Sequence, residues 1–153
     1  MEERYLLPEE LKEERSYQLR PHLLWSFFFL YGNIVMKFSE SLKKNSDFTF
    51  CYKKGVSKAN RLLVMYVHHN NLEKNRLGIS VSKKVGNSIV RHHLTRLIRE
   101  SYRLHEDIFN SGLDIVVVAR VGAKEASYKE IESALLHLAN LQKITVNKNM
   151  ETC

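Results

Sequence analysis

Positively charged side chains recur with helical spacing in the segment from Gly78 to Arg103. On a helical wheel the polar and cationic positions fall within an arc of about 140°. The members of this arc, which we call the cationic stripe, are Arg91, His92, Thr95, Arg96, Arg99 and Arg103. Because the arginine fork matches phosphate oxygens, several arginines on one rigid face favour an extended polyanion over a single small anion. The spacing therefore predicts a nucleic-acid contact.

An ordinary solvated helix face is the alternative explanation of the stripe, and most charge runs are of that kind. Such a face is commonly stabilised by acidic partners three or four residues away. The acidic residue within this helix, Glu100, falls outside the arc on the helical wheel. We therefore expect the stripe to lack acidic partners, and we favour the nucleic-acid interpretation.

The opposite side of the same predicted helix is apolar, which is the pattern of a helix that packs against a core. Its members are Val90, Leu94, Leu97, Ile98 and Leu104. A polar turn precedes the helix, and there Asn87 or Ser88 can accept hydrogen bonds from the first free N–H groups. Lys83 and Lys84 extend the positive charge into this turn.

Histidines and acidic residues could instead form a hydrolytic centre, but their spacing argues against one. Adjacent residues on a helix diverge by about 100°, so His92 and His93 cannot easily hold the same metal ion. The acidic residues are scattered, and no cluster would hold the two Mg²⁺ ions of an in-line phosphodiester hydrolysis. We expect no catalytic residue and no metal ligand in the protein; a protein-only nuclease built on the histidines is the weaker alternative.

Three aromatic residues have two possible roles. Phe48 and Tyr52 lie four residues apart on a predicted helix, and Tyr66 lies on a predicted strand. Beside basic residues, aromatic rings can stack on unpaired RNA bases, each stack contributing about 1–3 kcal/mol. Rings at helical spacing are more often part of a core. Spacing alone favours the core for these three, and Phe50 is expected to be a plain core or rim residue.

The predicted elements indicate an α+β sandwich with three helices and a mixed sheet of about four strands. The expected helices are 39–52, capped by Ser39 or Ser41, 89–105, and 127–141, which opens with a capping box of Ser127 and Glu130. The expected strands are 54–59 at an edge, 61–68, 77–82 and 114–120. The last strand, DIVVVAR, is almost continuously β-branched, which is typical of a central strand covered on both faces.

Composition and charge indicate one basic domain. The chain has 153 residues, of which 44% are hydrophobic and 27% charged, enough for one sizeable core. Residues 1–35 carry 4 basic and 6 acidic side chains, whereas residues 36–153 carry 20 basic and 11 acidic ones. The second part, with a net charge of +9, favours a polyanionic partner.

The domain is expected to span residues 36–142, between an extension at 1–35 and a flexible tail at 143–153. We expect the extension to arise from an upstream reading frame, with an amphipathic docking segment as the alternative. Its apolar run at 23–35 is shorter than the about 20 residues of a membrane helix, so no membrane association is expected. Two cysteines, Cys51 and Cys153, are too few for a disulfide framework and fit a reducing cytoplasm.

The segment at 78–103 resembles the protein subunit of bacterial ribonuclease P. That family has a Ser-Val-Ser-Lys-Lys-x-Gly-Asn run, here residues 80–87, before a helix with Arg-Asn-Arg and then Arg-Leu-Ile-Arg. The likeness extends from about Met36 to Leu141, through DFTFCYKKG, NRLLVMYV, DIVVVAR and YKEIESALLHL in the family's order. Two departures occur in the helix: Arg-Asn-Arg is here Arg91-His92-His93, and Thr95 replaces a common lysine.

The resemblance implies a fold, an activity and partners. The fold is an α/β sandwich in which the strand–helix–strand crossover is left-handed. The activity is that of a subunit which assists a catalytic RNA in removing the 5′ leader from precursor tRNA, with Mg²⁺ held mainly by that RNA and no small-molecule cofactor. The implied partners are the catalytic RNA and precursor tRNA, whereas a non-catalytic structural RNA-binding protein of ribosomal type is the alternative.

Two sets of site residues also follow from the resemblance. The set expected to bind the catalytic RNA is Lys83, Lys84, Asn87, Arg91, His92, His93, Arg96, Arg99 and Arg103. The set expected to hold the single-stranded leader, in a cleft between the first helix and the sheet, is Phe48, Tyr52, Tyr66, His92, Thr95 and Arg99.

Overall fold

The computed structural model describes residues 36–146. The expected extension at 1–35 lies outside the described residues. Residues 147–153 of the expected tail lie outside them as well. Across 36–146, no helix combines the length and the apolar character needed to cross a membrane.

Five strands form one mixed sheet in the order β1-β4-β5-β3-β2. Their bounds are Ser39–Ser41 (β1), Val56–Ala59 (β2), Leu63–His69 (β3), Asn75–Val81 (β4) and Leu113–Ala119 (β5). β1, β4 and β5 run parallel to one another, while β3 pairs antiparallel with both β5 and β2. β5 therefore lies at the centre, as its β-branched sequence predicts, and all of its residues except Val118 are buried.

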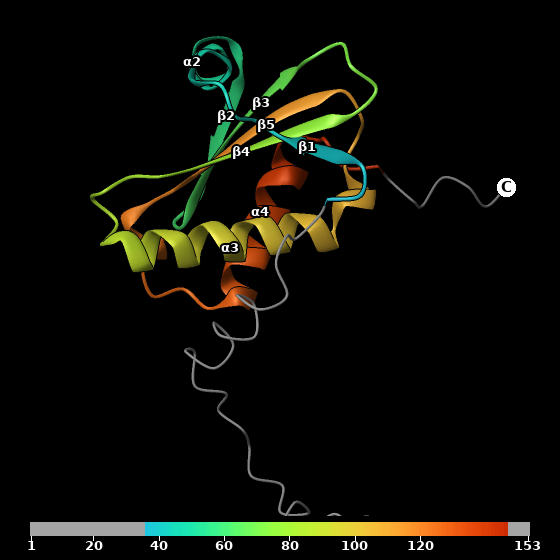
Figure 1. Ribbon diagram of the computed structural model, residues 1–153. Helices are drawn as coiled ribbons and strands as arrows, with labels where there is room; N and C mark the ends of the chain where they lie inside the picture. The colour runs from blue at the N-terminus through green and yellow to red at the C-terminus, as the bar shows by residue number, and fades with distance from the viewer. Residues whose placement is uncertain (1–35, 147–153) are drawn as a thin grey trace, which may run out of the picture. The chain divides into compact units, whose positions relative to one another are not determined.

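Helices cover both faces of this sheet. The α-helices are α2 (Asn45–Lys54), α3 (Ser88–Leu104) and α4 (Tyr128–Leu141), and two short 3₁₀ helices are η2 (Glu106–Ile108) and η3 (Val121–Ala123). α3 makes the crossover between the parallel strands β4 and β5. Figure 1 shows α3 and α4 on one side of the sheet and α2 on the other.

Each face of the sheet has its own apolar cluster, because successive residues of a strand point to opposite faces. The cluster beneath α3 and α4 is the larger and includes Met65, Val67, Leu94, Ile98, Ile115, Val117, Ile131 and Leu135. The cluster beneath α2 is small: its buried members are Leu42, Cys51 and Val116, with Phe48, Tyr66 and Val118 packed against them. The stability of the domain thus resides mainly on the α3–α4 side.

Local sequence signals set the starts of α3 and α4, as predicted. The side-chain oxygen of Asn87 accepts from the Val90 N–H at 3.0 Å, so Asn87 rather than Ser88 is the N-cap of α3. Ser127 and Glu130 make the reciprocal hydrogen bonds of a capping box at the start of α4.

The prediction for the first helix was wrong at its start. The structure begins α2 at Asn45, and residues Ser39–Ser41, which were expected to open the helix, form β1 instead. Neither predicted serine caps the helix, since its N-cap is Lys44, which makes no side-chain hydrogen bond there. The sheet consequently has five strands, one more than expected.

Distant residues hold β1 in its extended conformation. The N–H groups of Lys37 and Phe38 donate to the two carboxylate oxygens of Glu106, at 2.8 and 3.0 Å. The Ser39 hydroxyl hydrogen-bonds the Tyr102 hydroxyl at 2.9 Å, and β1 pairs with β4. Tertiary contacts therefore override the helical pattern read from neighbouring residues.

The apolar side of α3 also differs from its prediction at one position. Leu104 was expected to pack but is 51% exposed, because it ends the helix just before η2. Tyr102 is fully buried, with its ring 4.8 Å from that of Phe109. Leu94 and Ile98 are fully buried as expected.

Candidate RNA interface

The cationic stripe lies on the partly exposed side of α3. Lys83, Lys84, Asn87 and His92 are exposed. The remaining members of the predicted RNA-binding set, Arg91, His93, Arg96, Arg99 and Arg103, are partly exposed, as is Thr95. One helix and the turn before it therefore carry all the residues that were expected to contact the catalytic RNA.

One end of the stripe is neutralised within the helix. The Arg103 guanidinium donates to both carboxylate oxygens of Glu100, at 2.9 Å from Nε and 2.6 Å from Nη2. This hydrogen bonding is the main reason that the pKa of Arg103 is raised. The expectation that the stripe lacks acidic partners is therefore wrong for Arg103, because long side chains three residues apart can bridge their separation on a helical wheel.

Arg91, near the other end of α3, retains an unmet hydrogen-bonding capacity. Its Nε atom is buried and has no hydrogen-bond partner within residues 36–146. Leaving a buried donor unpaired costs about 1–3 kcal/mol.

The two histidines of α3 have different surroundings. His92 is exposed, whereas His93 is partly buried, and burial lowers the pKa of His93. No group of three or more histidine, cysteine or carboxylate side chains that could hold a metal ion occurs in the described part of the chain.

The aromatic residues of α2 and β3 form a cluster on the other face of the sheet, which we call the aromatic cluster: Phe48, Tyr52 and Tyr66. The rings of Tyr52 and Tyr66 meet edge to face with centroids 5.0 Å apart, and the Phe48 centroid is 6.4 Å from that of Tyr52. Tyr52 is 40% exposed, and the other two are partly exposed. Phe48 and Tyr66 pack against the small core beneath α2, as spacing alone favours, but all three rings also keep part of their surface exposed.

Phe50 lies on the rim of α2. It is 49% exposed, and its ring meets that of His68 edge to face at 4.8 Å. Of the two positions expected for it, core or rim, the structure shows the rim.

A close approach between α2 and β4 positions Phe48. A Cβ atom at Gly78 would lie 2.7 Å from Cε1 of the Phe48 ring, well inside van der Waals contact. Cys51 is the fully buried residue of α2, and burial raises the pKa of its thiol to about 11. Cys51 thus remains a neutral, small, apolar filler, as expected from the sequence.

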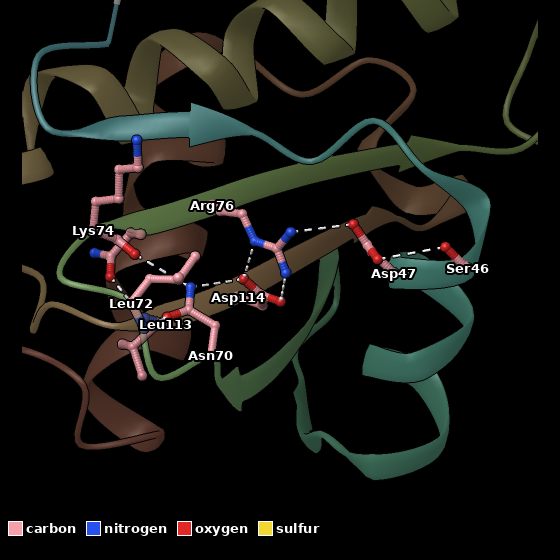
Figure 2. Close-up of polar contacts among 9 residues, drawn as sticks. Ser46, Asp47, Asn70, Leu72, Lys74, Arg76, Leu113 and Asp114 are labelled. Atoms are coloured by element: carbon pink, nitrogen blue, oxygen red, sulfur yellow. Dashed lines mark hydrogen bonds and ion pairs between the residues drawn. The ribbon is translucent and has the colours of Figure 1, made fainter.

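A charged bridge, which the sequence reasoning missed, links α2 to two strands (Figure 2). Arg76 of β4 donates to both carboxylate oxygens of Asp114 of β5, at 2.7 Å from Nε and 2.5 Å from Nη2. Its Nη1 atom donates to Asp47 of α2 at 3.2 Å, and Asn70 donates to Asp114 at 2.8 Å. Asp114 is 3% exposed. The sequence did offer one sign of this bridge: Asp114 stands in a buried β-branched strand, and a buried charge requires a partner.

The stripe and the aromatic cluster lie on opposite faces of the sheet. α2 packs on the face of Tyr66 and Val116, whereas α3 packs on the face of Met65 and Val117. The predicted leader-binding residues are therefore divided between the two faces. The structure brings Phe48, Tyr52 and Tyr66 together, but it places His92, Thr95 and Arg99 on α3.

Several known proteins are similar to this chain in sequence and in the arrangement of their elements. The family model described as Ribonuclease P matches residues 36–143. The ribonuclease P protein component of Lachnoclostridium phytofermentans is 66% identical over 106 residues, covering 69% of this chain and 91% of that protein. The corresponding protein of Alkaliphilus metalliredigens is 55% identical over 109 residues, covering 71% and 98%.

Solved structures agree with these sequence relationships. The RNase P protein of Staphylococcus aureus superposes with a TM-score of 0.65 at 41% identity, covering 69% of this chain and 97% of that one. The RNase P protein of Thermotoga maritima in complex with 1-(4-fluorophenyl)-2-thiourea gives a TM-score of 0.61 at 33% identity, covering 63% and 94%. The chain therefore belongs to the ribonuclease P family, as a protein subunit of that ribonucleoprotein endonuclease.

Proposed function

We propose that the two faces of this protein bind two different RNA elements. The cationic stripe, with Lys83, Lys84 and Asn87, docks on the catalytic RNA of ribonuclease P. The aromatic cluster holds unpaired nucleotides of the 5′ leader of precursor tRNA. The protein thereby adds affinity for a substrate that carries a leader, affinity that mature tRNA lacks.

The observation that supports leader binding is the partial exposure of the aromatic cluster on one face of the sheet. An edge-to-face pair such as Tyr52 and Tyr66 presents ring surface to solvent, and every nucleobase has a face that can stack on it. Stacking on aromatic side chains requires unpaired bases. A leader supplies such bases, whereas the paired acceptor stem of a tRNA does not.

The observation that supports RNA docking is the concentration of cations along one rigid helix. Contacts of Arg91, Arg96 and Arg99 with phosphates would release counterions and make the association strongly dependent on salt. Relative to the family pattern, His93 stands in place of an arginine and Thr95 in place of a common lysine, so the helix carries fewer permanent cations. The arginines that remain would carry most of the electrostatic attraction.

Catalysis in this proposal belongs to the RNA partner. The described residues provide no cluster of metal ligands, so Mg²⁺ would be held mainly by RNA, where it would stabilise the attacking and leaving oxygens. Cys51 is a buried free thiol, which fits a reducing cytoplasm as the place of action.

Reconstitution at low Mg²⁺ tests the proposal. The full chain, the catalytic RNA and precursor tRNA are combined, and cleavage is compared with that by each component alone. We expect efficient cleavage only from the mixture, together with tighter binding of precursor tRNA as its leader is lengthened by the first few nucleotides. Cleavage by the protein alone, or RNA binding that neither aids cleavage nor senses the leader, would contradict it and favour the alternatives.

A further inference from the structure

The attachment of α2 to the sheet depends on few contacts. Cys51 is its only fully buried residue, and Phe48 packs beside it against Gly78. The N-cap residue Lys44 makes no side-chain hydrogen bond. Cys51 and Phe48 hold one side of α2, but its first turn has no buried residue, so the orientation of that turn depends on a further contact.

The bridge of Asp47, Arg76 and Asp114 supplies that second point. Arg76 and Asp114 are register partners on the adjacent strands β4 and β5, and their bidentate pairing fixes the plane of the guanidinium. The fixed guanidinium presents Nη1 to Asp47, one turn of helix before Cys51. Asn70 holds Asp114 from the other side at 2.8 Å.

Burial makes this bridge more than a surface ion pair. The side chains of Arg76 and Asp47 are each 27% exposed, and that of Asp114 is 4% exposed. The hydrogen bond to Asp114 is the main cause of the raised pKa of Arg76, which therefore stays charged. Two nitrogens of Arg76, Nε and Nη2, thus donate to Asp114 of the sheet, and the third, Nη1, donates to Asp47 of α2.

We propose that Asp47, Arg76 and Asp114 position α2 so that Phe48 and Tyr52 lie correctly over Tyr66 for leader binding. Asp47 precedes Phe48 directly, so a displacement of the first turn of α2 moves the Phe48 ring. These three are positioning residues, since they act through the aromatic cluster. The inference rests on the proposed leader binding and adds the residues that set its geometry.

The test compares the affinities of the reconstituted holoenzyme for precursor and mature tRNA. Asp47→Ala removes the link between α2 and Arg76 while leaving Arg76 paired with Asp114. We expect the preference for precursor over mature tRNA to fall about fivefold, roughly what losing part of one base stack would cause. Asp47→Glu, which retains the carboxylate, should recover part of the preference.

Glu125→Ala is the matched control for charge. Glu125 is exposed in the turn before α4, and its removal changes the net charge by the same amount as Asp47→Ala. Because loss of an acidic group favours binding of any RNA, both variants gain the same nonspecific attraction. Only Asp47→Ala should lose the preference for precursor tRNA.

A double-mutant cycle separates positioning from a general loss of stability. If the bridge acts through the cluster, Asp47→Ala should lower the preference little further in a Phe48→Ala background. Additive losses, or equal losses for precursor and mature tRNA, would overturn the inference. Asp47→Asn, which keeps the size of the side chain, is measured beside it in case Asp47→Ala does not fold.

The same data distinguish this inference from the function on which it rests. If Phe48→Ala leaves the preference unchanged, the proposed leader binding itself fails. If Phe48→Ala lowers the preference while Asp47→Ala and Asp47→Asn do not, leader binding stands and the positioning role is wrong.

Discussion

Individual arginines of the stripe differ in what they already contact, and this difference should appear in RNA binding. Arg103 is paired with Glu100, whereas Arg91 has a buried Nε without a partner within residues 36–146. We expect Arg91→Ala to weaken association with the catalytic RNA and to lower its salt dependence by about one unit of slope. Arg99→Ala should behave similarly.

Binding titrations at several salt concentrations measure this effect. Lys124→Ala is the matched control, since Lys124 is an exposed cation that follows η3 and lies outside the predicted RNA-binding set. It removes the same charge without a predicted phosphate contact. Unchanged affinity and slope in both arginine variants would show that the stripe is only a solvated face.

Phe48 should discriminate precursor from mature tRNA. Its ring lies in the aromatic cluster, so Phe48→Ala removes ring surface that, in the proposed function, stacks on unpaired leader bases. We expect weaker binding of precursor tRNA, by about 1–3 kcal/mol, with nearly unchanged binding of mature tRNA. Phe50→Ala removes a ring from the same helix outside the cluster, and an equal effect of both variants would contradict the assignment.

His93 should make the stability of the domain dependent on pH. Burial lowers its pKa below the ordinary value of 6.5, so the folded state favours the neutral ring. The stability is complete above pH 6.5 and falls as the pH drops below it, because the unfolded chain takes up the proton first. The melting temperature of His93→Gln should therefore fall less than that of the wild type between pH 7.5 and 5.

Residue types and spacing predicted part of the arrangement of the candidate site. The stripe was predictable because a helical wheel orders residues that are near in sequence. The pairing of Arg103 with Glu100 was missed because side-chain length is not part of that geometry. The bridge of Asp47, Arg76 and Asp114 could not be derived, since its members come from three distant segments that only the folded sheet brings together.

At the scale of elements, the close packing of α2 against β4 is as important for the aromatic cluster as the side chains that α2 contributes to it. Gly78→Ala would place a Cβ atom 2.7 Å from the Phe48 ring and displace it. We expect a loss of about 1–3 kcal/mol in the free energy of unfolding, the usual cost of overpacking, and a reduced preference for precursor tRNA. Urea unfolding and tRNA titrations measure the two effects.

A compensating variant checks the cause of that loss. In a Phe48→Ala background the ring is gone and the remaining close neighbour of the added methyl group is Leu42 Cδ2 at 3.1 Å, so the methyl group should cost less stability than in the wild type. An equal cost in both backgrounds would mean that the clash with Phe48 is not the reason.

The predictability of the elements follows from the strength of their local patterns. β5 and α4 have continuous β-branched residues or a complete capping box, and both were predicted with nearly correct bounds. β1 has three polar residues and no pattern of its own. Its conformation depends on Glu106, Tyr102 and β4, so no local signal could have separated it from the helix that follows.

At the scale of the whole molecule, the sheet separates the two surfaces that we propose bind RNA. The stripe lies on the face with the large core, where α3 is held rigidly by α4 and the strands. The aromatic cluster lies on the face with the small core, where α2 depends on Cys51 and the charged bridge. This difference between the two faces suits the proposed function, in which the subunit stays on the catalytic RNA while it releases the cleaved leader.

Residues 1–35 should be dispensable for this function. They lie outside the described residues, and their 4 basic and 6 acidic side chains oppose the attraction of the basic remainder for RNA. The family match begins at residue 36, and every element that carries either surface follows that position. We therefore expect a chain beginning at Met36 to support cleavage of precursor tRNA and to bind the catalytic RNA at least as tightly as the full chain.

Cleavage rates and salt titrations of the two chains, reconstituted side by side, measure this prediction. The shortened chain should gain affinity most at low salt, because the repulsion it has lost is screened at high salt. A gain that does not vary with salt would point to a non-electrostatic cause. A loss of cleavage, with the shortened chain still folded, would show that residues 1–35 contribute a contact of their own.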